Sequence, residues 1–255
     1  MDLLDTTLLA QQLRDFAPIL AFDTVSSTQT ALADHLVQQR GIPGQWHLAI
    51  ADQQTAGRGR TGAQWHAQPG EALLLTLATQ LPLAPPLWPR ASLIAGLAVA
   101  ETLGQHVRLK WPNDLLIQQK NWLKLGGILC ERLETPQGPW WLCGLGLNLR
   151  GVPTGLEMHA AALESLKTRE ELAVRLIRQI QQEIQQFVLQ QGNLPLDRLH
   201  ARLAFQGEQV EMSDQHAGIL HGLAHDGGLR VGERVLHAGS IVRAPDFVAQ
   251  NARQY

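Results

Sequence analysis

Residues 53–65 read Gln-Gln-Thr-Ala-Gly-Arg-Gly-Arg-Thr-Gly-Ala-Gln-Trp, and three glycines fall within six positions with two arginines between them. Glycine lets backbone N–H groups approach a ligand with no Cβ in the way. The planar, permanent charge of arginine suits phosphate or carboxylate. The segment therefore predicts a loop that holds an anion, most simply the phosphates of a nucleotide. Taken alone, it also fits a surface turn with solvated arginines.

The same loop satisfies the dinucleotide-binding pattern G-x-G-x-x-G from Gly57 to Gly62. That pattern is meaningful only where a helix begins at the loop and an acidic residue follows about 20 positions later. Here the turn residues Pro69 and Gly70 follow, and residues 78–83 contain no carboxylate. We therefore exclude a dinucleotide-binding fold. The phosphate loop G-x-x-x-x-G-K-[ST] is absent from the sequence as well.

Two polar segments lie where strands or helices are expected to begin. Ser27 and Thr28 precede a run of helical spacing, where hydroxyls and free N–H groups either cap the helix or hold a polar ligand group. Residues 110–114 read Lys-Trp-Pro-Asn-Asp between two apolar strands. Proline, asparagine and aspartate are turn residues, so this segment is either a plain turn or a turn that presents an amide and a carboxylate to a ligand.

Two glycine-containing segments are expected inside strands. Residues 124–129 read Lys-Leu-Gly-Gly-Ile-Leu, and glycine inside a strand favours a close approach by a ligand or another backbone. Residues 144–149 read Gly-Leu-Gly-Leu-Asn-Leu. Positions i and i+2 face the same side of a strand, so Gly144 and Gly146 either bare a patch of backbone for a flat ligand or mark a bulge.

In this order and spacing, the four glycine, lysine and asparagine motifs resemble those of biotin protein ligases, from about Asp23 to about Val242. The motifs are Gly-Arg-Gly-Arg-x-Gly-x-x-Trp, Lys-Trp-Pro-Asn-Asp, Lys-Leu-Gly-Gly-Ile-Leu and Gly-x-Gly-x-Asn. The resemblance implies an α+β fold: a mixed β-sheet with flanking helices, of the class II synthetase-like kind found in biotin ligase catalytic domains. A small C-terminal SH3-like β-barrel is expected to follow.

The resemblance also implies roles for individual residues. The expected catalytic residues are Lys124, Arg58 and Arg60. The expected biotin-binding residues are Ser27, Thr28, Gln29, Gln54, Arg58, Gly59, Arg60, Lys124, Gly126, Gly127, Gly144 and Gly146. The expected nucleotide-binding residues are Arg60, Trp65, Asn113, Asp114 and Asn148, and Asp114 is the candidate ligand of Mg²⁺. Family members often carry arginine at the position of Ala63, so this chain departs from the family within the loop.

The implied activity is that of a biotin–[biotin carboxyl-carrier protein] ligase, which uses biotin, ATP and Mg²⁺. Such an enzyme makes biotinyl-5′-AMP and then transfers biotin to a lysine of a carrier protein. Three alternatives stay open: a lipoate or octanoate ligase with related chemistry, a biotin-responsive transcription factor, and a biotin-binding module without catalysis. The resemblance leaves a homodimer open as well.

The remaining sequence predicts two domains. Helices are expected over residues 3–16, 90–103, 169–190 and 196–205, and Thr168 with Glu171 predicts a capping box for the third. From residue 206 onwards short apolar runs are separated by glycines, a texture typical of a small barrel. We therefore expect a catalytic domain over residues 1–205 and a β domain over residues 206–255.

Composition narrows the function classes. The chain has 255 residues, 45% of them hydrophobic, with a formal net charge of −2 and no basic block; this argues against DNA as a partner. The segment before Asp23 is too short for the DNA-binding domain that many relatives carry, so we expect a form without it. The acidic start of the chain is unlike the positively charged start of a signal peptide. No long uncharged apolar stretch predicts a membrane helix. We therefore expect a cytoplasmic location. Cys130 and Cys143 are expected to be free thiols.

Overall fold

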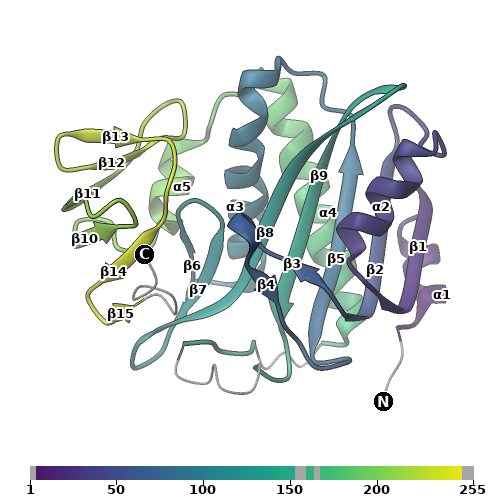
Figure 1. The fold of residues 1–255 in the computed structure, drawn as a ribbon, viewed down its shortest axis with the longest axis horizontal. Coiled ribbons are helices and arrows are strands. Elements are labelled where there is room, and N and C mark those ends of the chain that lie inside the picture. Colours follow the sequence, from purple (N-terminus) through teal and green to yellow (C-terminus); the bar gives the residue numbers. More distant parts are fainter. Residues whose placement is uncertain (1–3, 153–158, 164–166, 249–255) are drawn as a thin grey trace.

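A seven-stranded sheet forms the centre of the computed structural model, which describes residues 4–152, 159–163 and 167–248. The strand order is β1-β2-β5-β9-β8-β7-β6 (Figure 1). The strands are β1 (Phe16–Val25), β2 (Trp46–Gln54), β5 (Ala72–Thr79), β6 (Val107–Lys110), β7 (Asp114–Gln118), β8 (Trp122–Thr135) and β9 (Gly138–Asn148). β1 and β2 run parallel, whereas every other neighbouring pair is antiparallel. The predicted mixed sheet is therefore confirmed.

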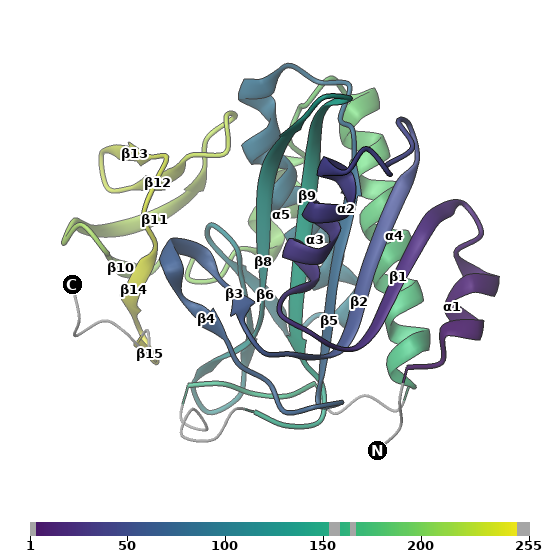
Figure 2. The same cartoon turned by 45° about the vertical axis from the view of Figure 1, so that its right-hand side comes forward.

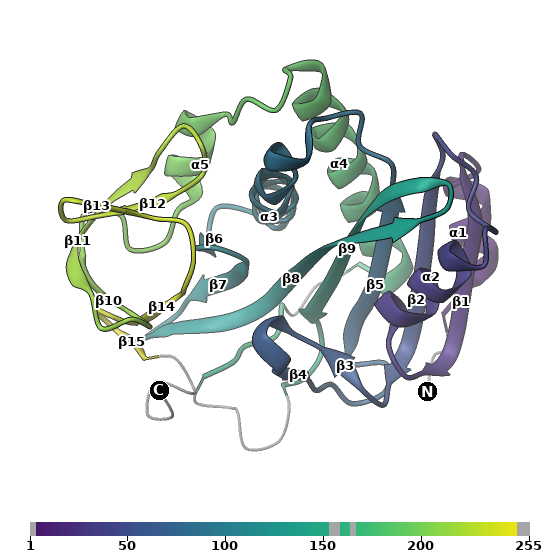
Figure 3. The same ribbon diagram turned by 45° about the horizontal axis from the view of Figure 1, so that its top comes forward.

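Helices cover both faces of this sheet (Figure 3). They are α1 (Thr6–Gln12), α2 (Thr28–Val37), α3 (Ala91–Leu103), α4 (Arg169–Leu189) and α5 (Leu196–Arg202), with 3₁₀ turns η1 (Arg60–Gly62) and η2 (Pro85–Arg90). α3 and α4 pack side by side over one face, and α2 lies on the other. The predicted fold class of a mixed sheet with flanking helices is confirmed.

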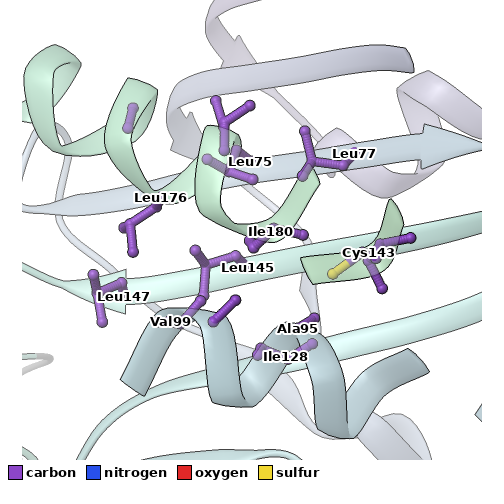
Figure 4. Close-up of a cluster of buried hydrophobic side chains, with 14 of the residues drawn as sticks. Leu75, Leu77, Ala95, Val99, Ile128, Cys143, Leu145, Leu147, Leu176 and Ile180 are labelled. Carbon is purple, nitrogen blue, oxygen red and sulfur yellow. The ribbon is translucent and has the colours of Figure 1, made fainter. Parts of the chain in front are cut away.

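The alternation of side chains along β9 divides the sheet into two different faces. Cys143, Leu145 and Leu147 point into the main core with α3 and α4, where they meet Val99 and Ile180 (Figure 4). The intervening positions belong to the opposite face: Trp140 and Leu142 pack under α2, and the glycines at 144 and 146 follow them. Because successive strand residues face opposite sides, this second face carries less side-chain volume where the glycines stand. Cys130 and Cys143 are free thiols, as predicted.

Helix ends follow local capping chemistry. Glu171 N–H donates to Thr168 Oγ1 at 3.2 Å and Thr168 N–H donates to Glu171 Oε2 at 3.1 Å, so the predicted capping box of α4 is confirmed. The first helix is shorter than the predicted 3–16. Asp5 accepts hydrogen bonds from the N–H groups of Thr7 and Leu8, which sets the start at Thr6, and the chain enters β1 at Phe16.

A second, six-stranded sheet follows the helices and lies beside the β6–β7 edge of the first (Figure 2). Its strands are β10 (Gln209–Met212), β11 (Ala217–Leu223), β12 (Leu229–Val231), β13 (Arg234–Leu236), β14 (Ile241–Ala244) and β15 (Phe247–Val248). All its neighbouring strands are antiparallel. Its apolar cluster also contains Leu109 and Trp111 from the first sheet's edge, and the Trp111 indole N–H donates to Gly227 O at 3.1 Å. The two sheets therefore share buried surface. No described helix is long and apolar enough to cross a membrane.

His47, on β2, is fully buried. Its Nε2 accepts a hydrogen bond from the N–H of Ile42 at 3.0 Å, and its ring stands edge-on to Trp140 with centroids 5.0 Å apart. Burial lowers the pKa of His47 to about 4, and the nearby His35 acts in the same direction, although a backbone hydrogen bond at Gln45 opposes both. The folded protein therefore keeps this imidazole neutral where an unfolded chain would protonate it.

We predict that the free energy of unfolding falls by about 2 kcal/mol between pH 7 and pH 5 because of His47. The unfolded chain takes up a proton near pH 6.5, whereas the folded chain does not until about pH 4. Unfolding therefore binds a proton between these values, and stability drops as the pH is lowered through them. Urea unfolding of His47→Gln should lose this part of the pH dependence, and the exposed His221→Gln should keep it. Equal pH dependence in both variants would contradict the assignment.

Candidate active site

A cavity of about 810 Å³ opens on the sheet face that carries α2. It is bounded by the start of α2, the 57–65 loop, β8, β9 and part of the second sheet. Lys124 and the glycine–arginine loop thus share one cavity, as the sequence predicts. The predicted residues that line it are Ser27, Thr28, Gln29, Gln54, Arg58, Gly59, Arg60, Trp65, Asn113, Asp114, Lys124, Gly127, Gly144, Gly146 and Asn148. Ala63 lines it too, and brings no charge.

The strand glycines create room for the cavity and for the loop. A Cβ at Gly146 would lie 2.6 Å from Cε2 of Trp65, so the indole of the loop occupies the space above this glycine. A Cβ at Gly144 would collide with Oε1 of Gln29. The register between β8 and β9 is continuous through both positions. The bulge that the sequence left open is therefore not formed. Gln29 and the Trp65 indole cover the two glycines, so a flat ligand lying against this backbone stays a prediction.

Gly126 is the one predicted site residue that does not line the cavity. It pairs with Leu147, and a Cβ there would contact Leu147 and Leu115. Those side chains are fully buried. Its neighbour Gly127 pairs with Gly146 and lines the cavity. The sequence placed both glycines at the ligand, but adjacent strand residues face opposite sides. Only Gly127 lines the cavity, and biotin binding by Gly126 stays a prediction.

The start of α2 is held rigidly against β2 and β5. The N–H and the hydroxyl of Thr28 both donate to Gln54 Oε1, at 2.7 and 3.0 Å, and the hydroxyl lies 2.9 Å from Thr76 Oγ1. Ser27 is the N-cap, with its hydroxyl 3.5 Å from the N–H of Thr30. The capping function is therefore confirmed for Ser27. Because this helix start also lines the cavity, capping and ligand binding do not exclude one another.

The 57–65 loop is a short hairpin over the cavity. Its strands are β3 (Gly57–Arg58) and β4 (Gln64–Trp65), and η1 forms the tip. Gly62, with φ of 80°, takes the left-handed conformation that favours glycine. Two side chains tie the loop to the sheet. Arg58 Nη2 lies 2.5 Å from Glu131 Oε1, and Arg60 Nη1 donates to Asn113 Oδ1 at 3.2 Å.

Asp114 stands between two lysines. Its Oδ2 lies 2.8 Å from Lys110 Nζ and its Oδ1 lies 2.8 Å from Lys124 Nζ. Burial alone would raise the pKa of Asp114, but the positive charges of the two lysines outweigh it and hold the pKa below its usual range. Lys110 is almost fully buried and also donates to Ile241 O of the second sheet at 3.2 Å. The triad therefore connects Lys124 with the second sheet.

Sequence reasoning missed several residues around the cavity. Glu131 does not line the cavity itself but contacts Gln29 and Arg58, which do. It follows Gly127 and Leu129 at strand spacing, so the period-2 pattern of β8 was a signal that could have found it. The second sheet and its connections supply Ser213, Asp214, Ala238, Gly239, Ser240, Val242 and Phe247. These depend on how the two sheets dock, for which the sequence gives no local signal. His66 and His159 also line the cavity and carry no motif.

The side chains of the described residues do not form a preformed metal-binding site. No group of three or more histidine, cysteine, aspartate or glutamate side chains that could hold an ion occurs among residues 4–152, 159–163 and 167–248. Both oxygens of Asp114 are already engaged by lysine ammonium groups. The side chains therefore do not fit a metal held by the protein alone, and Asp114 as a ligand of Mg²⁺ stays a prediction.

Comparisons with known proteins agree with this geometry. The sequence model of the "Biotin/lipoate A/B protein ligase family" matches residues 21–148. A biotin–[acetyl-CoA-carboxylase] ligase of Mycobacterium tuberculosis is 31% identical over 217 residues, covering 80% of this chain and 79% of that protein. The bifunctional ligase/repressor BirA of Bacillus subtilis is 34% identical over 140 residues, which cover 53% of this chain but only 41% of the repressor.

One solved structure shows how far the fold is shared. It is the biotin protein ligase from Aquifex aeolicus in complex with biotin and ATP, with a TM-score of 0.73 at 24% identity. The match covers 89% of this chain and 98% of that chain. At this identity the comparison shows a common fold and no more.

Proposed function

We propose that this chain is a biotin protein ligase. It belongs to the biotin and lipoate A/B protein ligase family. It activates biotin with ATP to biotinyl-5′-AMP and transfers the biotinyl group to a lysine of a biotin carboxyl carrier protein. The observation that carries this proposal is the shared cavity: Lys124 on β8 and Arg60 on the loop line one space together with the strand glycines Gly127, Gly144 and Gly146. Two cations facing one cavity suit a reaction between two anions.

In the first step the biotin carboxylate attacks the α-phosphorus of ATP and pyrophosphate leaves. Both reactants are negative, so the site must lower their repulsion. A unit charge pair at 4 Å is worth about 4 kcal/mol at an effective dielectric constant near 20. Lys124 and Arg60 supply such charges at the cavity. That Arg58 also supplies a charge to the reacting anions stays a prediction. Arg58 is already paired with the carboxylate of Glu131, which reduces the charge it can offer.

We divide the lining of the cavity into two groups of residues that suit the two substrates. We assign the biotin ring to the part formed by Ser27, Thr28, Gln29 and Gln54, beside Gly144 and Gly146, over which Gln29 and the Trp65 indole pack. We assign the nucleotide to the part near Asn113, Asp114 and Asn148, and we assign Trp65 to the nucleotide as well. Gly59 and Gly127 line the same cavity, and their lack of a side chain permits close approach of the ligand.

In the second step the amine of the acceptor lysine attacks the carbonyl of biotinyl-AMP, an amide forms and AMP leaves. The mixed anhydride is easily hydrolysed, so a loop that covers it and excludes water protects the intermediate. Asp114 is a poor general base, because its two lysine partners keep its pKa low. We therefore assign Asp114 to positioning Lys124. If Mg²⁺ accompanies ATP, it supplies charge neutralisation on the phosphates.

We further propose that the second sheet is an SH3-like barrel within a C-terminal domain of residues 206–255, after a catalytic domain of residues 1–205. Its six antiparallel strands and its apolar cluster support this. The carrier protein is the proposed macromolecular partner, and DNA is not. We expect a cytoplasmic location, and a homodimer stays an open alternative.

Biotin-dependent exchange of radiolabelled pyrophosphate into ATP tests the function. We expect exchange with biotin and none with lipoate or octanoate, followed by biotin transfer when a carrier protein is added. Exchange with lipoate instead would identify the lipoate ligase alternative. Biotin binding without exchange would identify a non-catalytic biotin-binding module and overturn the proposal.

A further inference from the structure

Arg58 and Glu131 form an ion pair that joins the 57–65 loop to β8. Arg58 Nη2 lies 2.5 Å from Glu131 Oε1, and both side chains are partly exposed, at 46% and 35%. The other oxygen of Glu131 accepts a hydrogen bond from Gln29 Nε2 at 2.7 Å. Glu131 therefore contacts the loop with one oxygen and the start of α2 with the other.

The two loop arginines differ in what compensates their charge. The charge of Arg58 is matched by one carboxylate that belongs to the protein. Arg60 donates to the neutral amide oxygen of Asn113, and within the described part of the chain it has no ion pair. Arg60 therefore offers its full positive charge to an anion, whereas Arg58 already has a counter-ion before any substrate arrives.

Apart from the packing of Trp65 over Gly146, the loop has little structure of its own. β3 and β4 are two residues each, and Thr61, Gly62, Ala63 and Gln64 are exposed. A segment with few buried apolar contacts opens at low free-energy cost. The side chains that reach from it to the sheet then decide how firmly it covers the cavity.

We propose that Glu131 is a positioning residue that holds Arg58, and through it the loop, over the cavity, so that Arg58 works as a tether and not as a charge on the reacting groups. The expected consequence of the tether is that the enzyme retains the biotinyl-AMP intermediate, and this consequence rests on the proposed function. A contrasting model makes Glu131 a competitor that substrate anions must displace from Arg58. The two models predict opposite effects of removing the carboxylate charge.

Trypsin tests the tether in the ligand-free protein, because it cleaves after arginine and the loop contains Arg58 and Arg60. In Glu131→Gln the ion pair is lost, while the side-chain oxygen still accepts from Gln29. We expect cleavage after Arg60 to become about two- to fivefold faster, the range that a partly exposed ion pair gives. Glu134→Gln is the matched control, because Glu134 lies on the same strand but pairs with Arg132 and not with a residue of the loop. Unchanged cleavage in Glu131→Gln would overturn the proposal.

A double-mutant cycle on the whole enzyme tests the consequence. We expect Arg58→Gln and Glu131→Gln each to speed dissociation of biotinyl-AMP by about two- to fivefold, and the double variant to be no faster than either single variant. Biotinyl-AMP should dissociate from Glu134→Gln at the wild-type rate. Additive effects, or slower dissociation in Glu131→Gln, would overturn the tether. If the wild type forms no biotinyl-AMP, the proposed function fails, but the trypsin result still decides whether the tether exists.

Discussion

Lys124→Ala should slow the formation of biotinyl-AMP by at least about tenfold, and by as much as about a thousandfold, while leaving the fold intact. A charge aimed at a reacting centre commonly contributes about 10²–10³ in rate. Lys124 lines the cavity, and its Nζ is held 2.8 Å from Asp114 Oδ1 and 5.9 Å from the centroid of the Trp65 ring. The measurement is single-turnover formation of biotinyl-AMP from biotin and ATP. Asp114 keeps its second partner, Lys110, so no unpaired buried charge is created.

The control for this prediction is Lys120→Ala. Lys120 is exposed on the turn between β7 and β8 and lies outside the cavity, so its loss should leave adenylation unchanged. Lys124→Arg should retain part of the rate, because the charge remains but its geometry changes. Unchanged adenylation in Lys124→Ala would mean that the lysine is not aimed at the reacting groups, and the mechanism would have to be reassigned.

Local chemistry explains why so much of the catalytic half was predictable. The apolar run at residues 72–79 forms β5, because an apolar run of strand length between turn residues has few alternatives. Ser27 caps α2 and Thr168 caps α4 as expected, because a cap is set by residues within one turn. The glycines at 144 and 146 face the cavity because strand periodicity alone puts them on one side.

Features that depend on contacts between distant segments could not be predicted from the sequence. Glu131 pairs with Arg58 across 73 positions, and Lys110 reaches Ile241 across 131. Gly126 was assigned to the ligand because its motif suggested it, although its register places it against Leu147. The contribution of the second sheet to the cavity follows from docking of two apolar surfaces. No pattern within either segment encodes that docking.

Asp114→Ala should lower the free energy of unfolding by about 3–5 kcal/mol, the usual cost of leaving a buried charge without its partner. Lys110 is 4% exposed. Within the part of the chain that the structure describes, its Nζ would keep its hydrogen bond to Ile241 O and its place 5.3 Å from the centroid of the Phe247 ring. At roughly 2–4 °C per kcal/mol for a chain of this size, the midpoint of thermal unfolding should fall by about 6–20 °C. Calorimetry or circular dichroism measures this shift.

Two further variants distinguish the destabilisation caused by an unpaired buried charge from that caused by a general loss of packing. Glu211→Ala removes one partner of an exposed pair, in which Glu211 and Arg243 are 3.5 Å apart, and should cost at most about 1 kcal/mol. Lys110→Met combined with Asp114→Ala removes both buried charges and should be more stable than Asp114→Ala alone. If the double variant were less stable than Asp114→Ala, Lys110 would be stabilising the junction of the two sheets without needing its carboxylate. The link from Lys124 through Asp114 to the second sheet would then be incidental to the fold.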